Sequence, residues 1–290
     1  MPHSYLTLTR ALELAGIEEA ADEAALLLLR YAGVSRVSLM LERDRLYDSP
    51  SLEDAVRRRL AREPLQYILG EWEFFGLPFT VSPHCLIPRP DTECLAEEAI
   101  RRIPKGGRFV DLCTGSGCIA VATLANRPDL EGVALELYPE TLALAVQNAA
   151  DNGVSARFTP VQADLLDGGT EALQVFAPFD AILSNPPYIP SSVIPQLSPE
   201  VRREPHAALD GGDDGLTFYR AILQRYAALL APGGLLLLEI GYDQGDALRE
   251  LCRTYLPSAE VEVLRDLGGN DRVVACTLHA TPTLHISRKV

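Results

Sequence analysis

Short apolar runs that alternate with helical patterns from Arg108 onward constrain the fold of this chain more than any other feature. The strand-like runs are RFVDL, GVALEL, ARFTPVQA, FDAILS and GGLLLLEIG, in that order. Helical patterns lie near residues 117–126, 140–151, 215–230 and 244–255. Strands that alternate with helices in this way predict an α/β fold built on a doubly wound parallel sheet.

The end of the chain departs from this alternation. The runs AEVEVLRD and RVVACTLH are joined only by residues 267–271. This connection is too short for a helical crossover between parallel strands, so the last two strands should form an antiparallel hairpin. Five parallel strands closed by such a hairpin resemble the seven-stranded, Rossmann-like sheet of S-adenosylmethionine-dependent methyltransferases.

The N-terminal part has a different pattern. Residues 1–70 are rich in Ala, Leu, Glu and Arg and show no strand-like alternation, so we expect a small helical bundle that recognises the substrate. Aromatic and β-favouring residues follow, and the turn at Gly76 and Pro78 predicts a β-hairpin that joins the two parts. The predicted domains are 1–70 for the bundle, 71–90 for the hairpin and linker, 91–280 for the methyltransferase-like domain and 281–290 for a flexible tail.

Composition excludes several classes of function. Acidic residues outnumber basic ones 40 to 26, for a formal net charge of −14, so we expect no direct nucleic-acid partner. The six cysteines have no zinc-like spacing, and the acidic loop from Asp210 to Gly215 lacks the spacing of a calcium site, so we expect no metal and a simple turn. No signal segment or membrane-spanning run is evident, which favours a cytoplasmic protein without a membrane partner.

A glycine-containing loop follows the first predicted strand and leads directly into a helix. Gly115, Gly117 and Ala120 satisfy the G-x-G-x-x-A pattern, in which the backbone approaches a ligand closely at a helix N-terminus. Glu136, at the end of the second strand, can accept hydrogen bonds from both hydroxyls of a ribose. Asp164, at the end of the third strand, could accept from an adenine amino group, or could instead be a helix cap or a surface carboxylate. These features fit NAD and S-adenosylmethionine about equally.

The tetrapeptide Asn185-Pro186-Pro187-Tyr188 follows the fourth predicted strand. The Asn185 side-chain oxygen and the Pro186 carbonyl can each accept one hydrogen of a planar NH2 group, and the Tyr188 ring can stack on its flat face. Two consecutive prolines end the strand and stiffen the loop, although the tetrapeptide alone could be an ordinary proline turn.

The choice between the two cofactors depends on this tetrapeptide. A dehydrogenase needs a proton donor, often histidine, and no histidine lies close in sequence to these strand ends. His84 and His206 lie in loops and could reach the site only by folding over it. Methyl transfer to an NH2 group is therefore favoured, and a Rossmann oxidoreductase is the alternative.

Seven motifs, which include the glycine loop and the tetrapeptide, extend along most of the chain. They are EPLQYILGEWEFFG, LIPRPDTE, DLCTGSG, SNPPYI, ALDGGDDGLTFYR, LEIGYDQG and RDLGGNDRVV. In this order they resemble the HemK family, the release factor glutamine methyltransferases. The resemblance implies S-adenosylmethionine as donor and, as substrate, the glutamine of the Gly-Gly-Gln loop in class I peptide chain release factors, whose methylation supports translation termination.

The same resemblance implies roles for individual residues. Residues that would line the methionine and ribose portions of the cofactor are Cys113, Thr114, Gly115, Ser116 and Gly117. Glu136 would hold the ribose, and Asp164, Leu165 and Asn185 would complete the cofactor site. The substrate glutamine and the catalytic step would depend on Asn185, Pro186, Pro187 and Tyr188.

The chain departs from the family pattern at three of these positions. Cys113 stands where the family usually has glycine, so we expect a backbone there that does not need positive φ. Glu136 replaces the commoner aspartate, and Leu165 occupies a position that is often aromatic.

Two other functions remain open. The NPPY motif alone is shared with methyltransferases that act on adenine or guanine amino groups of nucleic acids. A non-catalytic adaptor that retains the fold is a third hypothesis.

Overall fold

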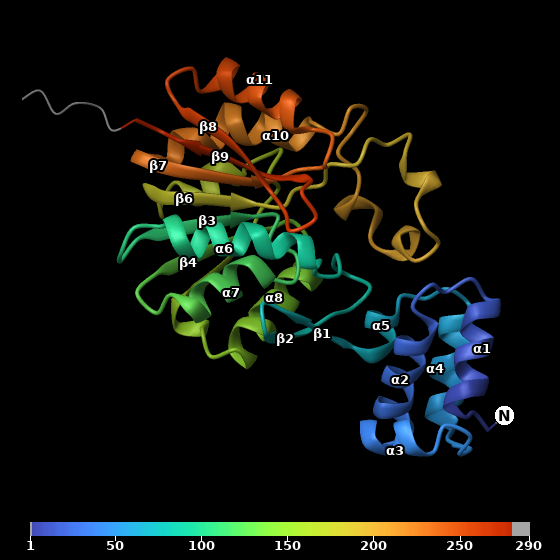
Figure 1. Ribbon diagram of the computed structural model, residues 1–290. Helices are drawn as coiled ribbons and strands as arrows, with labels where there is room; N and C mark the ends of the chain where they lie inside the picture. Colours follow the sequence, from blue (N-terminus) through green and yellow to red (C-terminus); the bar gives the residue numbers. More distant parts are fainter. Residues whose placement is uncertain (1, 280–290) are drawn as a thin grey trace, which may run out of the picture.

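The computed structural model describes residues 2–279 and contains a seven-stranded sheet with strand order β5-β4-β3-β6-β7-β9-β8 (Figure 1). Strands β3 to β7 are parallel, whereas β9 is antiparallel to both β7 and β8. The predicted fold class and the closing hairpin are confirmed, and the predicted flexible tail lies outside the described residues. The strands are β1 (Glu71–Phe74), β2 (Leu77–Thr80), β3 (Arg108–Leu112), β4 (Glu131–Glu136), β5 (Phe158–Gln162), β6 (Phe179–Ser184), β7 (Leu230–Glu239), β8 (Glu260–Arg265) and β9 (Asp271–Thr277).

Helices cover both faces of this sheet and form two separate cores. Phe109 and Val110 are neighbours on β3 and point into different cores, as successive strand residues do. Helices α6, α7 and α8 pack on the Phe109 side, and α10 and α11 on the Val110 side (Figure 1). The α-helices are α1 (Tyr5–Leu14), α2 (Ala20–Tyr31), α3 (Arg36–Leu41), α4 (Pro50–Leu60), α5 (Leu65–Leu69), α6 (Glu93–Arg102), α7 (Cys118–Asn126), α8 (Pro139–Asp151), α9 (Gly169–Leu173), α10 (Thr217–Ala221) and α11 (Gly245–Tyr255).

One predicted helix, 215–230, is wrong in detail. Helix α10 ends at Ala221, a π-helix continues over Ile222–Tyr226, and a 3-10 turn follows over Ala227–Leu229. Two buried tyrosines anchor this segment: the Tyr219 hydroxyl donates to the Glu239 carbonyl, and the Tyr226 hydroxyl donates to the Leu165 carbonyl. No proline or glycine marks the change from α to π geometry in the sequence.

Strand order brings the predicted site residues together. Strand β3 pairs with β4 on one side and β6 on the other, so the chain leaves β3 at the point where the sheet order reverses. Leu112, at the end of β3, is in register with Leu135 of β4 and Ser184 of β6. Because the carboxyl ends of parallel strands meet at one edge, the loops after these three strands surround a crevice, the usual ligand position in such sheets.

The N-terminal helices α1 to α5 form a bundle with its own apolar core, including Leu8, Leu12 and Leu52. Serine side chains cap three of its helices: Ser4 before α1, Ser35 before α3 and Ser49 before α4. The predicted hairpin follows as β1 and β2, which pair antiparallel around a turn. Residues 65–69 form the short helix α5, with Leu65 and Ile68 in the bundle core.

The segment between β6 and α10 contacts this bundle (gold in Figure 1). Arg59 of α4 is 4% exposed; its Nη1 donates to Glu200 Oε1 at 2.8 Å, and its Nε donates to Glu23 Oε2 at 2.5 Å. Arg62 Nη2 also donates to Glu200 Oε2, at 2.8 Å. Glu200 thereby ties the loop of the α/β part to two arginines of the bundle.

Arg59→Met should lower the free energy of unfolding of the bundle by about 2 kcal/mol. This is less than the loss for a fully buried ion pair, because Glu23 and Glu200 keep 13% and 20% exposure and can be hydrated. Urea denaturation followed by fluorescence of Trp72, the single tryptophan, measures the change, since its ring packs against the bundle core. Arg57→Met is the control: its exposed pair with Asp54 should contribute less than about 1 kcal/mol, and equal losses would contradict the expectation.

Candidate active site

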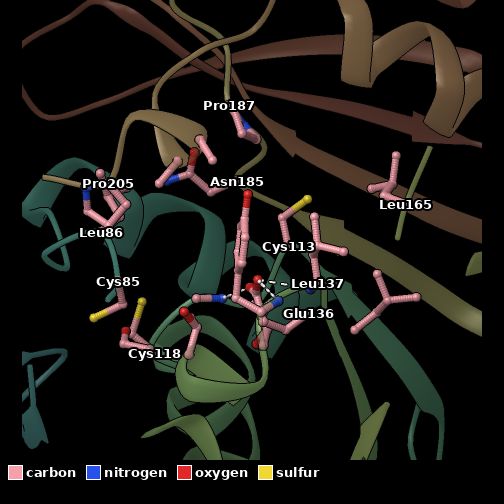
Figure 2. Close-up of a pocket in the computed structure, with 18 of the residues that line it drawn as sticks. Cys85, Leu86, Cys113, Cys118, Glu136, Leu137, Leu165, Asn185, Pro187 and Pro205 are labelled. Atoms are coloured by element: carbon pink, nitrogen blue, oxygen red, sulfur yellow. Dashed lines mark hydrogen bonds between the residues drawn. The ribbon is translucent and has the colours of Figure 1, made fainter. Parts of the chain in front are cut away.

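A cavity of about 210 Å³ lies at the carboxyl edge of the sheet (Figure 2). Its walls come from the loops that follow β3, β4, β5 and β6, and from two segments of other loops, 84–89 and 205–208. Figure 2 shows Asn185 and Pro187 on one side, Glu136 on another, and Cys113 between them. Among the residues described, no cluster of three or more His, Cys, Asp or Glu could hold a metal ion, and no helix is long and apolar enough to cross a membrane.

Most of the residues predicted to form the site line this cavity. They are Cys113, Thr114, Gly115, Ser116, Glu136, Asp164, Leu165, Asn185 and Pro187. Gly117, Pro186 and Tyr188 are not in its wall. A Cβ at Gly117 would lie 3.1 Å from Ala145 Cβ, so this glycine allows close packing of α7 on α8. The Tyr188 ring packs against the core on the α10 side.

Glu136 is held by three backbone N–H groups. Its Oε1 accepts from Leu137 N at 2.9 Å and from Tyr138 N at 3.1 Å, and its Oε2 accepts from Gly115 N at 3.1 Å (dashed in Figure 2). Burial raises the pKa of the carboxyl, and the three hydrogen bonds oppose this rise. Each carboxylate oxygen retains acceptor capacity, so a fixed, charged acceptor faces the cavity.

Cys113 corrects one prediction. Its φ is 58°, so the backbone adopts the left-handed conformation that had been expected not to occur there. The cause is local: the next residue, Thr114, donates its N–H to the Leu135 carbonyl at 3.0 Å, which turns the chain toward β4 immediately after β3. A non-glycine residue in this conformation costs about 1–2 kcal/mol. Burial raises the pKa of the thiol well above its usual value, so Cys113 is a neutral wall residue.

Asp111 lies behind the glycine loop and was not assigned a role from the sequence. It is fully buried, and Thr114 Oγ1 donates to its Oδ2 at 2.6 Å. Burial raises the pKa of this carboxyl to about 7. The contact fixes Thr114, and therefore the start of the loop, from inside the protein.

Asp164 and Leu165 form the far side of the cavity. Asp164 Oδ1 accepts from Leu166 N at 2.7 Å, which closes a local turn. Helix α9 begins only at Gly169, so this contact is not a helix cap. Leu165 is 3% exposed, and its carbonyl is held by the Tyr226 hydroxyl.

Asn185 lies at the end of β6, and its Nδ2 donates to Thr92 Oγ1 at 3.2 Å. Thr92 is buried and ends the short 3-10 turn Pro90–Thr92. This turn lies within the LIPRPDTE motif and leads directly into α6. No local pattern assigns Thr92 a role, because its contact with Asn185 spans 93 positions in the sequence.

The segment 84–89 also reaches the cavity, although its distance in sequence argued against this. Tyr67 Oη donates to the Cys85 carbonyl at 2.6 Å, and Thr141 Oγ1 donates to the His84 carbonyl at 2.6 Å. These bonds hold the segment over the strand ends. His84 is exposed and lines the cavity. The prediction that no histidine lies near these strand ends is therefore wrong for His84, because its loop folds over the site.

The acidic loop after residue 209 forms the expected turn. Asp210 Oδ1 accepts from Gly212 N at 2.9 Å and from Ser191 Oγ at 2.6 Å. These two hydrogen bonds to Asp210 Oδ1 fix the loop beside the tetrapeptide.

Comparisons with known proteins agree with this architecture. Residues 6–70 match the PrmC N-terminal domain, and residues 91–198 match the methyltransferase small domain. A release factor glutamine methyltransferase of Geobacter sulfurreducens is 43% identical over 89% of this chain and 90% of its own length.

Two solved structures are also similar to this chain. A protein-(glutamine-N5) methyltransferase from Alicyclobacillus acidocaldarius is 34% identical over 69% of this chain and 99% of its own, with a TM-score of 0.42. A methyltransferase from Pyrococcus furiosus, 18% identical over 71% of this chain and 91% of its own, has a TM-score of 0.53 and shares the fold alone. The 43% identity with the Geobacter protein extends over about nine-tenths of both chains and shows that the two proteins are members of one family. The chain belongs to the family of release factor glutamine methyltransferases.

Proposed function

We propose that this protein transfers a methyl group from S-adenosylmethionine to the side-chain amide nitrogen of the glutamine in the Gly-Gly-Gln loop of class I peptide chain release factors. The observation that carries the proposal is the position of Asn185 and Glu136 in the walls of one cavity, at the ends of the two strands that flank β3. One side chain suits an NH2 group and the other suits a ribose. The reaction belongs to the cytoplasm, where peptide release takes place.

The residues of the cavity fit S-adenosylmethionine, which is cationic at sulfur and carries no phosphate. Glu136 and Asp164 supply carboxylates, and Arg89 is the single Lys or Arg in the cavity wall among the described residues. Leu135, Leu137 and Leu165 supply apolar surface. Two carboxylates and a single cationic side chain in this wall disfavour the diphosphate of NAD, and with it the oxidoreductase alternative.

We assign the cofactor contacts to residues 113–116, Glu136, Asp164 and Leu165. Glu136 would hold the ribose hydroxyls, and Leu165 would lie against the adenine. When bound, S-adenosylmethionine supplies an activated methyl group on a sulfonium.

Asn185 and Pro186 would hold the substrate amide. An amide nitrogen is a poor nucleophile because its lone pair is delocalised into the carbonyl. The Asn185 side-chain oxygen and the Pro186 carbonyl would accept its two hydrogens, orient the nitrogen and stabilise positive charge that develops on it. No strong base is required if the proton leaves after methyl transfer. Pro187 and Tyr188 would fix the shape of the loop, and the Tyr188 ring does so by packing against the core outside the cavity wall.

The N-terminal helices would bind a remote part of the release factor. In this proposal residues 1–70 recognise the substrate, residues 71–90 connect, and residues 91–280 carry the chemistry. The contacts of Glu200 with Arg59 and Arg62 support the assignment, since they join the bundle to a loop whose neighbouring residues 205–208 line the cavity. The intact factor should therefore be a better substrate than a peptide of its loop.

The test is transfer of labelled methyl from S-adenosylmethionine to four acceptors: release factor, its Gln→Ala loop variant, ribosomal RNA and duplex DNA, each at two salt concentrations. Label confined to the intact factor is the expected result. Stronger label on either nucleic acid, falling steeply with salt, would replace the proposal with an NH2-directed nucleic-acid methyltransferase. No label on any acceptor would favour an adaptor.

Glu136→Gln should weaken the binding of S-adenosylmethionine by about 10- to 150-fold, because charge-assisted hydrogen bonds contribute about 1.5–3 kcal/mol. Glutamine keeps the length of the side chain but removes the charge and one acceptor. Isothermal titration calorimetry measures the affinity. Glu140→Gln, an exposed position in the first turn of α8, is the matched control and should bind as the parent does. Binding of NADH by the parent, or unchanged affinity in Glu136→Gln, would contradict the assignment.

A further inference from the structure

Asn185 can work in the proposed reaction only if its amide is turned one way. The Oδ1 atom must face the substrate NH2, since an Nδ2 group in that place would oppose the substrate hydrogens with its own. The two orientations have nearly the same shape, so packing alone does not choose between them. A hydrogen-bond partner that distinguishes Nδ2 from Oδ1 must do so.

Thr92 is that partner. Asn185 Nδ2 donates to Thr92 Oγ1 at 3.2 Å, and Thr92 is 2% exposed. A hydroxyl can donate one hydrogen and accept others, so Thr92 accepts from Asn185 only while its own hydrogen is directed elsewhere. A second, acceptor-only group next to Thr92 would ensure this.

Glu239, the last residue of β7, provides such a group. It is 1% exposed, and it follows Leu238, which is in register with Ser184 of β6, so it lies beside the start of the tetrapeptide. Burial raises its pKa, and the nearby hydroxyls of Thr92 and Tyr188 oppose this rise. Its buried Oε2 has no partner at standard hydrogen-bond geometry among residues 2–279, so it is a free acceptor beside these hydroxyls. An ionised carboxylate only accepts, and therefore takes the Thr92 hydrogen.

We infer that Glu239 and Thr92 are positioning residues that fix the Asn185 amide with its oxygen toward the substrate. In this arrangement the Thr92 hydroxyl donates its hydrogen to the Glu239 carboxylate. Thr92 Oγ1 can then only accept, and it accepts from Asn185 Nδ2. The same carboxylate would accept from the nearby Tyr188 hydroxyl, and one buried group would then orient two side chains of the tetrapeptide. The inference rests on the proposed function for its catalytic meaning, but the orientation itself does not.

Protonation of Glu239 would release this constraint. A neutral carboxyl can donate to Thr92 Oγ1, and the Thr92 hydrogen is then free to turn to Asn185 Oδ1, which favours the wrong amide orientation. Burial raises the pKa of Glu239 to about 7. The ordered state should thus be populated above neutral pH and lost as pH falls through this value.

Several charged and titratable groups surround Glu239 and affect its ionisation. Arg272 of β9 favours the ionised form, and Asp91 of the 3-10 turn opposes it. Tyr188, Tyr219 of α10 and Cys118 of α7 also face it, and burial raises the pKa of each. These three stay neutral between pH 6 and 8. Burial also raises the pKa of Asp111 to about 7, so the response in this range is assigned to Glu239 by its loss in Glu239→Gln, which leaves Asp111 unchanged.

The first measurement needs no substrate. The side-chain NH2 signals of Asn185 in a ¹⁵N-labelled protein, identified by their loss in Asn185→Ala, should shift between pH 6 and 8 with one midpoint near 7. In Glu239→Gln this midpoint should vanish. Signals that do not change with pH in the parent, or a midpoint that persists in Glu239→Gln, would overturn the inference whether or not the protein methylates release factors.

The second measurement uses activity. Glu239→Gln and Thr92→Val should each lower kcat by about 10- to 100-fold at pH 8, the range found when supporting partners of ligating groups are removed, with KM for S-adenosylmethionine unchanged. The parent kcat should rise from pH 6 to 8, and Glu239→Gln should lose this rise. Thr92→Ser restores the hydroxyl and should recover most of what Thr92→Val loses.

Thr123→Val is the matched control, because Thr123 of α7 is also fully buried and its hydroxyl has no partner among the described residues. It should retain the parent kcat and pH profile. If Thr92→Val matches Thr123→Val in kcat while the parent is active, the inference is wrong and the proposed function stands. If the parent transfers no methyl to release factor, the proposed function fails, and the Asn185 signals still decide the inference.

Discussion

Asn185→Ala should lower kcat for methylation of release factor by about 10²–10³, the loss that follows removal of one preorganised polar partner from a transition state. The side chain supplies the acceptor for one amide hydrogen, and no other side chain of residues 185–188 replaces it. Affinity for S-adenosylmethionine should stay within a few-fold of the parent, because the ribose contacts are assigned to Glu136 on the other side of the cavity. Single-turnover kinetics measure the rate, and calorimetry measures the affinity.

A matched control separates this effect from the loss of any asparagine. Asn126 ends α7, is exposed, and donates to the Ala122 carbonyl at 2.9 Å. Asn126→Ala should methylate at the parent rate. Methylation at the parent rate by Asn185→Ala, with intact fold, would remove the central assumption about the tetrapeptide.

Residues that directly follow a strand were the predictable part of the site. Strands β3, β4 and β6 are apolar runs with clear ends, and parallel strands end at one edge. The positions of Gly115, Glu136 and Asn185 in one cavity follow from this rule without any knowledge of side-chain contacts. The same rule applies to Glu239 at the end of β7, where the signal existed in the sequence and received no role.

Residues that reach the cavity from distant loops had no local signal. Thr92 contacts Asn185 across 93 positions, and Tyr67 fixes the segment around Cys85 through a contact between helix α5 and a loop. Such contacts depend on tertiary packing, which periodicity does not encode. The family motif LIPRPDTE marked the segment as important but did not say what it touches.

Cys113 was predicted incorrectly for a related reason. Left-handed backbone in a non-glycine residue is uncommon, so the residue type argued for ordinary φ. The bond from Thr114 N to the Leu135 carbonyl outweighs that preference, and such strain is typical of functional sites.

Gly211 packs against the backbone of the tetrapeptide, and a substitution there should have the second large effect on kcat. Gly211 lies against it through backbone atoms: a Cβ at this position would be 2.7 Å from Tyr188 Cα and 2.9 Å from the Pro187 carbonyl oxygen. It would also be 2.8 Å from Gly215 Cα. Backbone atoms on all three sides cannot move away as the end of a flexible side chain can, and Gly211 N donates to the Ile189 carbonyl at 2.9 Å, which holds the two loops together.

Gly211→Ala should therefore displace residues 187–189 and lower kcat by about 10²-fold, the cost of a misplacement of about 1 Å at reacting groups. Affinity for S-adenosylmethionine should change much less, because Glu136 and the glycine loop do not contact Gly211. Gly268→Ala is the control: like Gly211 it does not have positive φ, but a Cβ there would meet only the side chains of Asn270 and Asp266, at 3.2 Å. It should keep the parent rate. Thermal denaturation of both variants shows whether a slow enzyme is still folded at the assay temperature. A folded Gly211→Ala protein with the parent kcat would show that the tetrapeptide tolerates displacement, and that its backbone position does not limit the reaction.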